Sequence, residues 1–288
     1  MLLSLKLSII KVMFTKEEIM ETALENFDLK GKTVLVAGGG RRSVRAVIDL
    51  EPEMLICSCV PGDTGRLNRI FNELGGERRD AEVLSINLSE PSIFGSGSFD
   101  FILMDYLVNK IDRFAPRKHI DILKNLHGYL KSQGNLVVVD IEPDSPPAHE
   151  LVSYTGMIES LVNVEKNLSL ELDDPARFRF YERIRKLIDD LALNHGVPGF
   201  KCIPGDWVEQ WLIGIGFIDV TPQIASRLVS AEVNDEYEKQ VRSFVGLIDD
   251  EKIRKYVVAL MDRTEALMRE ASPYEFEQDV YIISAVKK

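Results

Sequence analysis

At residues 32–44 the sequence is KTVLVAGGGRRSV, an apolar run that ends in three consecutive glycines and continues as a helix-like pattern. A buried parallel strand needs an uninterrupted apolar run of this kind. Glycines have no Cβ, so they let a ligand approach the backbone amides of a turn. This stretch therefore predicts a buried strand, a ligand-binding turn and a short helix.

Further apolar runs follow and alternate with helical patterns. The predicted strands are 33–37, 54–60, 82–86, 99–105, 134–140, 216–221 and 280–286. The predicted helices between them are 43–50, 67–74, 116–130 and 206–213. Such alternation is typical of βαβ units with a parallel sheet covered on both faces. We therefore expect an α/β fold with a seven-stranded, mostly parallel, doubly wound sheet.

The composition excludes several classes of protein. The 288 residues carry a formal net charge of −11, which argues against a broad nucleic-acid surface because such surfaces neutralise phosphates with Lys and Arg. Three scattered cysteines predict a reducing, cytoplasmic setting. No apolar run approaches the roughly 20 residues that span a bilayer, and the four histidines are too far apart in the sequence to suggest a metal site. We expect no nucleic-acid, membrane or metal partner.

Five segments, taken together and in this order, resemble the class I S-adenosylmethionine-dependent methyltransferases. They are the glycine motif at 34–40 and the segments 98–103, 126–139, 211–217 and 281–288. The resemblance covers most of the chain from Gly31 to the end. It implies the Rossmann-like methyltransferase fold, S-adenosylmethionine as the cofactor, and methyl transfer to an O, N, S or C atom of a small-molecule substrate.

The resemblance also implies where the cofactor lies. In the family, the glycine turn receives the methionine end, the end of the second strand binds the ribose, and residues after the third strand face the adenine. Carried onto this chain, the cofactor-binding positions are Ala37, Gly38, Gly39, Gly40, Cys59, Asp63, Asn87, Leu88 and Asp105. The Asn87 amide is a suitable acceptor for the adenine amino group, although an Asn at this place also favours a turn.

Three positions depart from the family pattern. Val36 replaces the acidic residue before the first glycine, and Arg42 stands where the third spaced glycine falls. Cys59 replaces the ribose-binding carboxylate, so that Asp63 is the nearest acidic residue in the sequence. These departures keep open a non-catalytic protein that retains the fold as a binding or assembly module.

Two further interpretations compete at the same stretch. The three glycines, together with a strand that ends in Asp105, also resemble the aminopropyltransferases such as spermidine synthase. A dinucleotide-binding motif needs a third glycine where Ser43 stands, with an acidic residue about 20 positions later.

Candidate catalytic residues follow from the rule that sites in open α/β sheets lie at the carboxyl ends of strands. Asp105 and Tyr106 follow the fourth predicted strand, and Asp140 and Glu142 follow the fifth. Methyl transfer needs an acceptor held in line and sometimes a general base. These four residues are therefore the catalytic candidates.

The helical stretches that interrupt the strand pattern define the expected organisation. We predict an N-terminal helical segment at 1–30, a Rossmann-like core at 31–145 and 201–288, a helical lid insert at 146–200, and a second helical insert within the core at 225–272. A capping box of the Ser/Thr-x-x-Glu form, from Thr15 to Glu18, marks the start of the N-terminal helix. Apolar residues in the first and last of these helical regions leave open a homodimer.

Overall fold

The strands of this protein form a single sheet. The computed structural model describes residues 13–59, 64–74, 81–91, 93–115, 117–143, 203–231, 242, 245–246, 251–270 and 274–288. The strands are β1 (Met13–Phe14), β2 (Thr33–Ala37), β3 (Met54–Cys59), β4 (Ala81–Ser85), β5 (Phe99–Asp105), β6 (Leu130–Ile141), β7 (Phe217–Ala231) and β8 (Tyr274–Lys287). The helices are α1 (Lys16–Leu24), α2 (Arg41–Asp49), α3 (Thr64–Glu73), the 3-10 turn η1 (Val108–Lys110), α4 (Ile111–Phe114), α5 (His119–Tyr129), α8 (Gly205–Ile215) and α10 (Glu251–Glu270).

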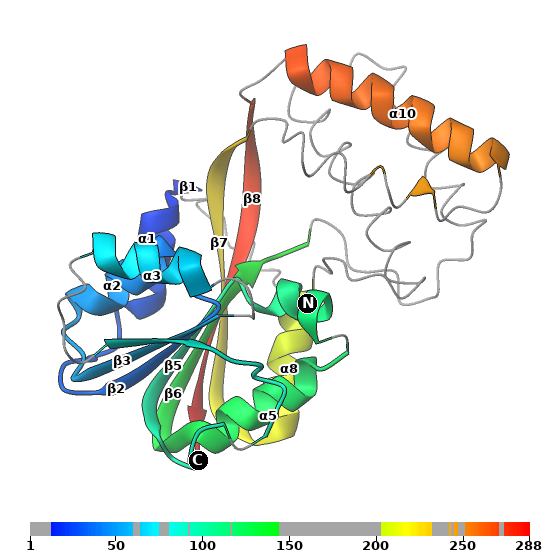
Figure 1. The fold of residues 1–288 in the computed structure, drawn as a ribbon. Coiled ribbons are helices and arrows are strands. Elements are labelled where there is room, and N and C mark those ends of the chain that lie inside the picture. Colours follow the sequence, from blue (N-terminus) through cyan, green and yellow to red (C-terminus); the bar gives the residue numbers. More distant parts are fainter. Residues whose placement is uncertain are drawn as a thin grey trace, which may run out of the picture.

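The strand order is β1-β7-β8-β6-β5-β2-β3-β4 (Figure 1). Strands β2 to β6 pair in parallel, and β8 runs antiparallel to both β6 and β7. The seven strands expected from the sequence are all present, so the predicted fold class is confirmed. The structure adds an eighth strand, β1, which pairs with β7 through two residues.

Helices cover both faces of the sheet because the strand side chains alternate. In β2, Val34 and Val36 pack with α1, α2 and α3, whereas Leu35 and Ala37 pack with α5 and α8. The side chains of β5 alternate between the same two clusters, so this strand is buried on both faces. Figure 1 shows α1 to α3 on one side of the sheet and α5 with α8 on the other. Two apolar layers therefore hold the carboxyl ends of the central strands in fixed positions.

The last two strands are longer than the sequence predicted. Strand β7 has 15 residues and β8 has 14, and they pair from Phe217 with Lys287 to Ala231 with Tyr274. Figure 1 shows this pair extending beyond the other strands toward α10. The predicted start of the second insert at 225 is therefore wrong, since residues 225–231 belong to β7.

The N-terminal helix begins as predicted. Thr15 Oγ1 accepts a hydrogen bond from the Glu18 N–H at 3.2 Å, and Glu18 Oε2 accepts one from the Thr15 N–H at 2.5 Å, which completes the capping box. The lid insert predicted at 146–200 lies entirely outside the described part of the chain, which leaves out residues 144–202.

Packing between the segment that follows α1 and the sheet gives a stability prediction. Phe101 is buried in β5, and its ring meets that of Phe27 edge to face, with 5.0 Å between centroids. Phe101→Ala should lower the free energy of unfolding by about 3 to 5 kcal/mol, because it leaves a cavity in the core. Urea denaturation measures this change. The control Ile213→Ala, at an exposed position of α8, should change it by less than about 1 kcal/mol.

Candidate active site

The glycine turn after β2 is fixed by the chain's own packing. Gly38 has φ +86°, and a Cβ on it would lie 2.9 Å from the Asp105 carbonyl oxygen and 3.0 Å from Leu107 Cβ. A Cβ on Gly39 would lie 2.8 Å from Val36 Cγ1. The first glycine therefore supplies both a left-handed conformation and a close approach between two strand ends.

Asp105 locks this turn to the end of β5. Its Oδ2 accepts hydrogen bonds from the Gly40 N–H at 2.8 Å and the Ser43 hydroxyl at 2.7 Å, and the residue is 6% exposed. Burial raises the pKa of the Asp105 carboxyl, while these two hydrogen bonds and the charges of Lys110 and Arg66 oppose the rise. The carboxyl is thus a fixed element of the site wall, next to the start of α2.

Tyr106, the next residue, is held in a strained conformation. Its φ is +48°, which a non-glycine residue rarely adopts, and its N–H donates to the Val139 carbonyl at 2.8 Å. Burial raises the pKa of its phenol to about 12. Among the described residues the hydroxyl has no hydrogen-bond partner. Strain and an unpaired buried hydroxyl at a strand end are features that cluster at functional sites.

Arg227 comes to the site from the extended part of β7. It is 6% exposed, and its Cζ lies 5.1 Å from the centroid of the Tyr106 ring, in cation–π contact. Its Nε, at 3.1 Å, and its Nη2 both donate to the amide oxygen of Gln278. Sequence analysis missed Arg227, because it placed the residue in a helical insert. A sequence pattern could have revealed it: Arg227 stands two positions after Ala225, and residues two apart in a strand point to the same face.

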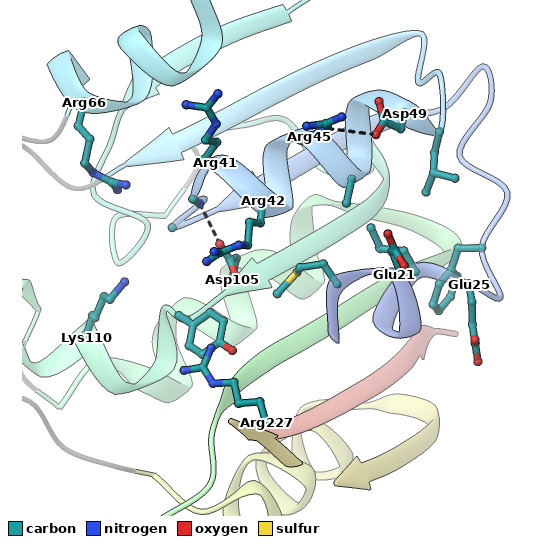
Figure 2. Close-up of a pocket in the computed structure, with 18 residues that line it drawn as sticks. Glu21, Glu25, Arg41, Arg42, Arg45, Asp49, Arg66, Asp105, Lys110 and Arg227 are labelled. Atoms are coloured by element: carbon teal, nitrogen blue, oxygen red, sulfur yellow. Dashed lines mark hydrogen bonds and ion pairs between the residues drawn. The ribbon is translucent and has the colours of Figure 1, made fainter. Parts of the chain in front are cut away.

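A large pocket, with a volume of about 1260 Å³, opens at this edge of the sheet and continues between α1 and α2 to Phe27 and Leu50. Figure 2 shows its lining side chains, which come from α1, α2, α3, η1 and the ends of β5 and β7. Six of these residues are basic and four are acidic: Arg41, Arg42, Arg45, Arg66, Lys110 and Arg227 against Glu21, Glu25, Asp49 and Asp105. The pocket is therefore more basic than the chain as a whole, whose net charge is −11.

Of the predicted cofactor residues, Gly38, Gly40 and Asp105 line this pocket. A second cavity of only about 10 Å³ lies on the other side of Gly38, and Cys59 and Leu88 line it together with Ser58, Ile86, Leu107 and Phe114. The structure thus brings these predicted positions together around the glycine turn. Ala37 is fully buried at the end of β2, behind the turn.

Asn87 Oδ1 accepts hydrogen bonds from the N–H of Ser89 at 3.2 Å and from its hydroxyl at 2.8 Å, so the side chain caps its own turn. This is the turn role that the sequence left open beside the adenine role. Asp63 lies outside the described residues.

Asp140 and Glu142, the catalytic candidates after β6, both accept hydrogen bonds from backbone N–H groups. Asp140 is 1% exposed, and its two oxygens accept from the backbone N–H of Asn109 at 3.0 Å, from its side-chain amide at 2.8 Å, and from the Ile141 N–H at 2.8 Å. Asn109 Oδ1 in turn accepts from the Ile203 N–H at 2.7 Å, and Glu142 Oε2 from the Gly205 N–H at 2.8 Å. Both carboxylates therefore join the end of β6 to the start of α8, and their catalytic role stays a prediction.

No group of three or more His, Cys, Asp or Glu side chains in the described part of the chain is placed to hold a metal ion. Among the helices described, none is long and apolar enough to cross a membrane.

The strand order and the glycine turn define the fold of the class I S-adenosylmethionine-dependent methyltransferases. Structures similar to this chain include a candidate methyltransferase from Bacillus halodurans C-125 and the YcgJ protein from Bacillus subtilis. Each has a TM-score of 0.55 and 13% identity, and the matches cover 94% of this chain and 99% and 97% of those chains.

A third similar structure is Haemonchus contortus phosphoethanolamine N-methyltransferase 2, solved with phosphomonomethylethanolamine and S-adenosylhomocysteine. Its TM-score is 0.50 at 10% identity, over 94% of this chain and 52% of that one. No protein-family model and no curated protein matches the sequence.

Asp140 gives a pH-dependent prediction. Burial raises the pKa of its carboxyl to about 6, whereas an unfolded Asp has a pKa of about 3.9. Between these values the folded carboxyl holds a proton that the unfolded chain has lost. Its contribution to the free energy of unfolding should therefore fall as the pH rises through this range, by about 3 kcal/mol in total.

Urea denaturation of the wild type and of Asp140→Asn, at several pH values from about 4 to about 7, measures this effect. The variant does not titrate at this position, so the difference between the two proteins isolates the Asp140 carboxyl. The wild type should lose stability relative to the variant as the pH rises. A difference that stays constant over this range would contradict the raised pKa.

Proposed function

We propose that the protein transfers the methyl group of S-adenosylmethionine to a small-molecule acceptor. One observation carries the proposal: a pocket of about 1260 Å³ opens beside the glycine turn of a sheet with the methyltransferase strand order, and continues between α1 and α2 as far as Leu50. This volume exceeds the roughly 300–1,000 Å³ of an ordinary small-molecule site. It leaves space for the methionine end of the cofactor and for an acceptor beside it.

The chemical character of the residues at this edge suits the cofactor. The turn from Gly38 to Gly40 presents backbone to the pocket, as the methionine end requires. The cavity lined by Cys59, Leu88 and Phe114 offers an apolar slot for the adenine, and the Ser58 hydroxyl beside it has no hydrogen-bond partner among the described residues. Because this slot has about 10 Å³ in the structure, its side chains must move apart before the adenine can enter.

The chain's own residues would act by positioning. The bound cofactor supplies an electrophilic methyl group on a sulfonium. Asp105 holds the glycine turn against β5, and Tyr106 and Arg227 form the wall on which an acceptor would rest. Holding the acceptor close to the methyl group and in line with it supplies much of the rate in a displacement of this kind.

The geometry of Asp105 disfavours aminopropyl transfer. That reaction would use this carboxylate as a base or as a ligand for the amine. Here Oδ2 is already bound by the Gly40 N–H and the Ser43 hydroxyl, and the residue is nearly fully buried. Methyl transfer therefore agrees better with the site than aminopropyl transfer does.

Calorimetric titration with S-adenosylhomocysteine tests the proposal. We expect binding to the wild type and at least about tenfold weaker binding to Gly40→Ala, because the added methyl group occupies the pocket wall. A Cβ at Gly40 would have as its nearest atom Asp105 Oδ2 at 3.4 Å, so this variant should fold. The control Gly128→Ala, in α5, has no atom within 4 Å of the added Cβ and should bind like the wild type.

The opposite result is equally clear. A wild-type protein that gives no heat with about 1 mM S-adenosylhomocysteine would have less than about 4 kcal/mol of binding free energy. That outcome would remove the enzymatic proposal and favour a non-catalytic protein with this fold.

The narrow apolar slot gives a second prediction. Phe114 lines it and is only partly buried. Phe114→Ala should widen the slot and make S-adenosylhomocysteine bind more tightly, by roughly three- to tenfold, because the wild type must first displace this ring. The same titration measures the effect. Weaker binding by Phe114→Ala would mean that the ring packs against the bound ligand instead of blocking its entry.

A further inference from the structure

Basic side chains from four separate elements meet in one part of the pocket. Figure 2 shows Arg42, Arg66, Lys110 and Arg227 around Asp105, contributed by α2, α3, η1 and β7. Their charges act on the same volume: Arg66 and Lys110 oppose the rise in the pKa of Asp105, and Arg42 lowers that of Arg227. A concentration of like charge within a chain of net charge −11 needs an explanation.

Two more arginines of the pocket form ion pairs at the surface. Arg41 forms an ion pair with Glu73, and Arg45 forms one with Asp49 at 3.7 Å. All four of these side chains are more than half exposed. Solvent-exposed ion pairs of this kind contribute little to stability and are common on protein surfaces, so these two arginines do not indicate a ligand.

Arg227 is different because it is buried and its hydrogen-bond partner is neutral. Nε and Nη2 both donate to the single amide oxygen of Gln278, and the guanidinium stacks on the Tyr106 ring. No carboxylate of the described residues forms an ion pair with it. Burial lowers the pKa of this guanidinium, which shows the electrostatic cost of its position. A buried charge is normally paired or bound to a ligand.

The free part of the guanidinium suits an oxyanion. An Arg has five N–H donors in a planar fork. The described contacts use Nε and Nη2, so Nη1 and the second hydrogen of Nη2 stay available on the edge that binds carboxylate or phosphate in bidentate fashion. Lys110, also in the pocket lining, adds a second cation near this edge of the sheet.

We propose that the methyl acceptor carries a carboxylate or phosphate group, and that Arg227 binds this group in the pocket. The inference rests on the proposed function, since it names the substrate class of the same site. The Tyr106 ring and Gln278 hold the guanidinium in place, and the surrounding basic side chains attract an anionic ligand from solution. The oxyanion would replace the carboxylate partner that Arg227 lacks.

Calorimetry on the protein saturated with S-adenosylhomocysteine tests the proposal. Inorganic phosphate and acetate are titrated separately at constant ionic strength set with chloride, so that the two arms distinguish phosphate from carboxylate. We expect one of them to bind, and Arg227→Gln to weaken that binding by about 10- to 100-fold. Arg227→Lys keeps the charge and should lose less. The control Lys118→Gln, an exposed residue paired with Asp121, should leave the affinity unchanged.

Each other outcome has a definite meaning. Equal anion affinity in the wild type and Arg227→Gln would overturn the proposal, as would the absence of binding by both anions. Anion binding that disappears when S-adenosylhomocysteine is added would also overturn it, because the cations would then serve the carboxylate of the cofactor. If Arg227→Gln does not fold, the anion affinities of Lys110→Gln and Arg227→Lys, measured in the same titration, test the proposal in its place.

The test also separates the two proposals from each other. If S-adenosylhomocysteine does not bind, the proposed methyl transfer fails. Anion binding to the free wild type that is lost in Arg227→Gln would then keep Arg227 as an anion-binding residue but not as an acceptor site. Unchanged anion binding would overturn both proposals.

Discussion

The hydrogen bonds that Asp105 accepts from Gly40 and Ser43 are the constraint on which the site depends. They join the end of a central strand to the start of α2, where backbone N–H groups favour a negative partner. These hydrogen bonds fix the glycine turn on one side of Asp105 and the strained conformation of Tyr106 on the other. The pocket wall is therefore preformed by the core of the sheet and does not depend on a ligand for its shape.

Much of this framework could be predicted from local sequence. The strands 33–37 and 99–105 were predicted with their observed ends, because each is a largely apolar run: glycines follow the first, and Asp105 closes the second. The extensions of β7 and β8 could not be predicted in this way. Their residues mix polar and apolar types, and their pairing joins Phe217 to Lys287 across the second insert. Arg227 lies in such an extension, which is why its role was missed.

The positions of site residues were easier to predict than their roles. The rule that sites lie at strand carboxyl ends placed Asp105, Tyr106, Asp140 and Glu142 at the correct edge. It could not tell a pocket-lining side chain from one whose acceptors are occupied. Apart from the Ile141 N–H, the donors to Asp140 and Glu142 belong to residues 31 and 63 positions away, and only the folded chain brings them together.

The same two carboxylates have a consequence for how this fold varies. Asp140, through Asn109, and Glu142 hold residues 203 and 205 beside the end of β6, so the segment 144–202 leaves and re-enters the core at one fixed place. When two chain ends are held side by side, the entropy of joining them grows slowly with the length of the connection, by about 0.6 kcal/mol for each doubling of a flexible one. An insert of another length or sequence could therefore replace it during evolution, or by design, while the sheet and the glycine turn stay unchanged.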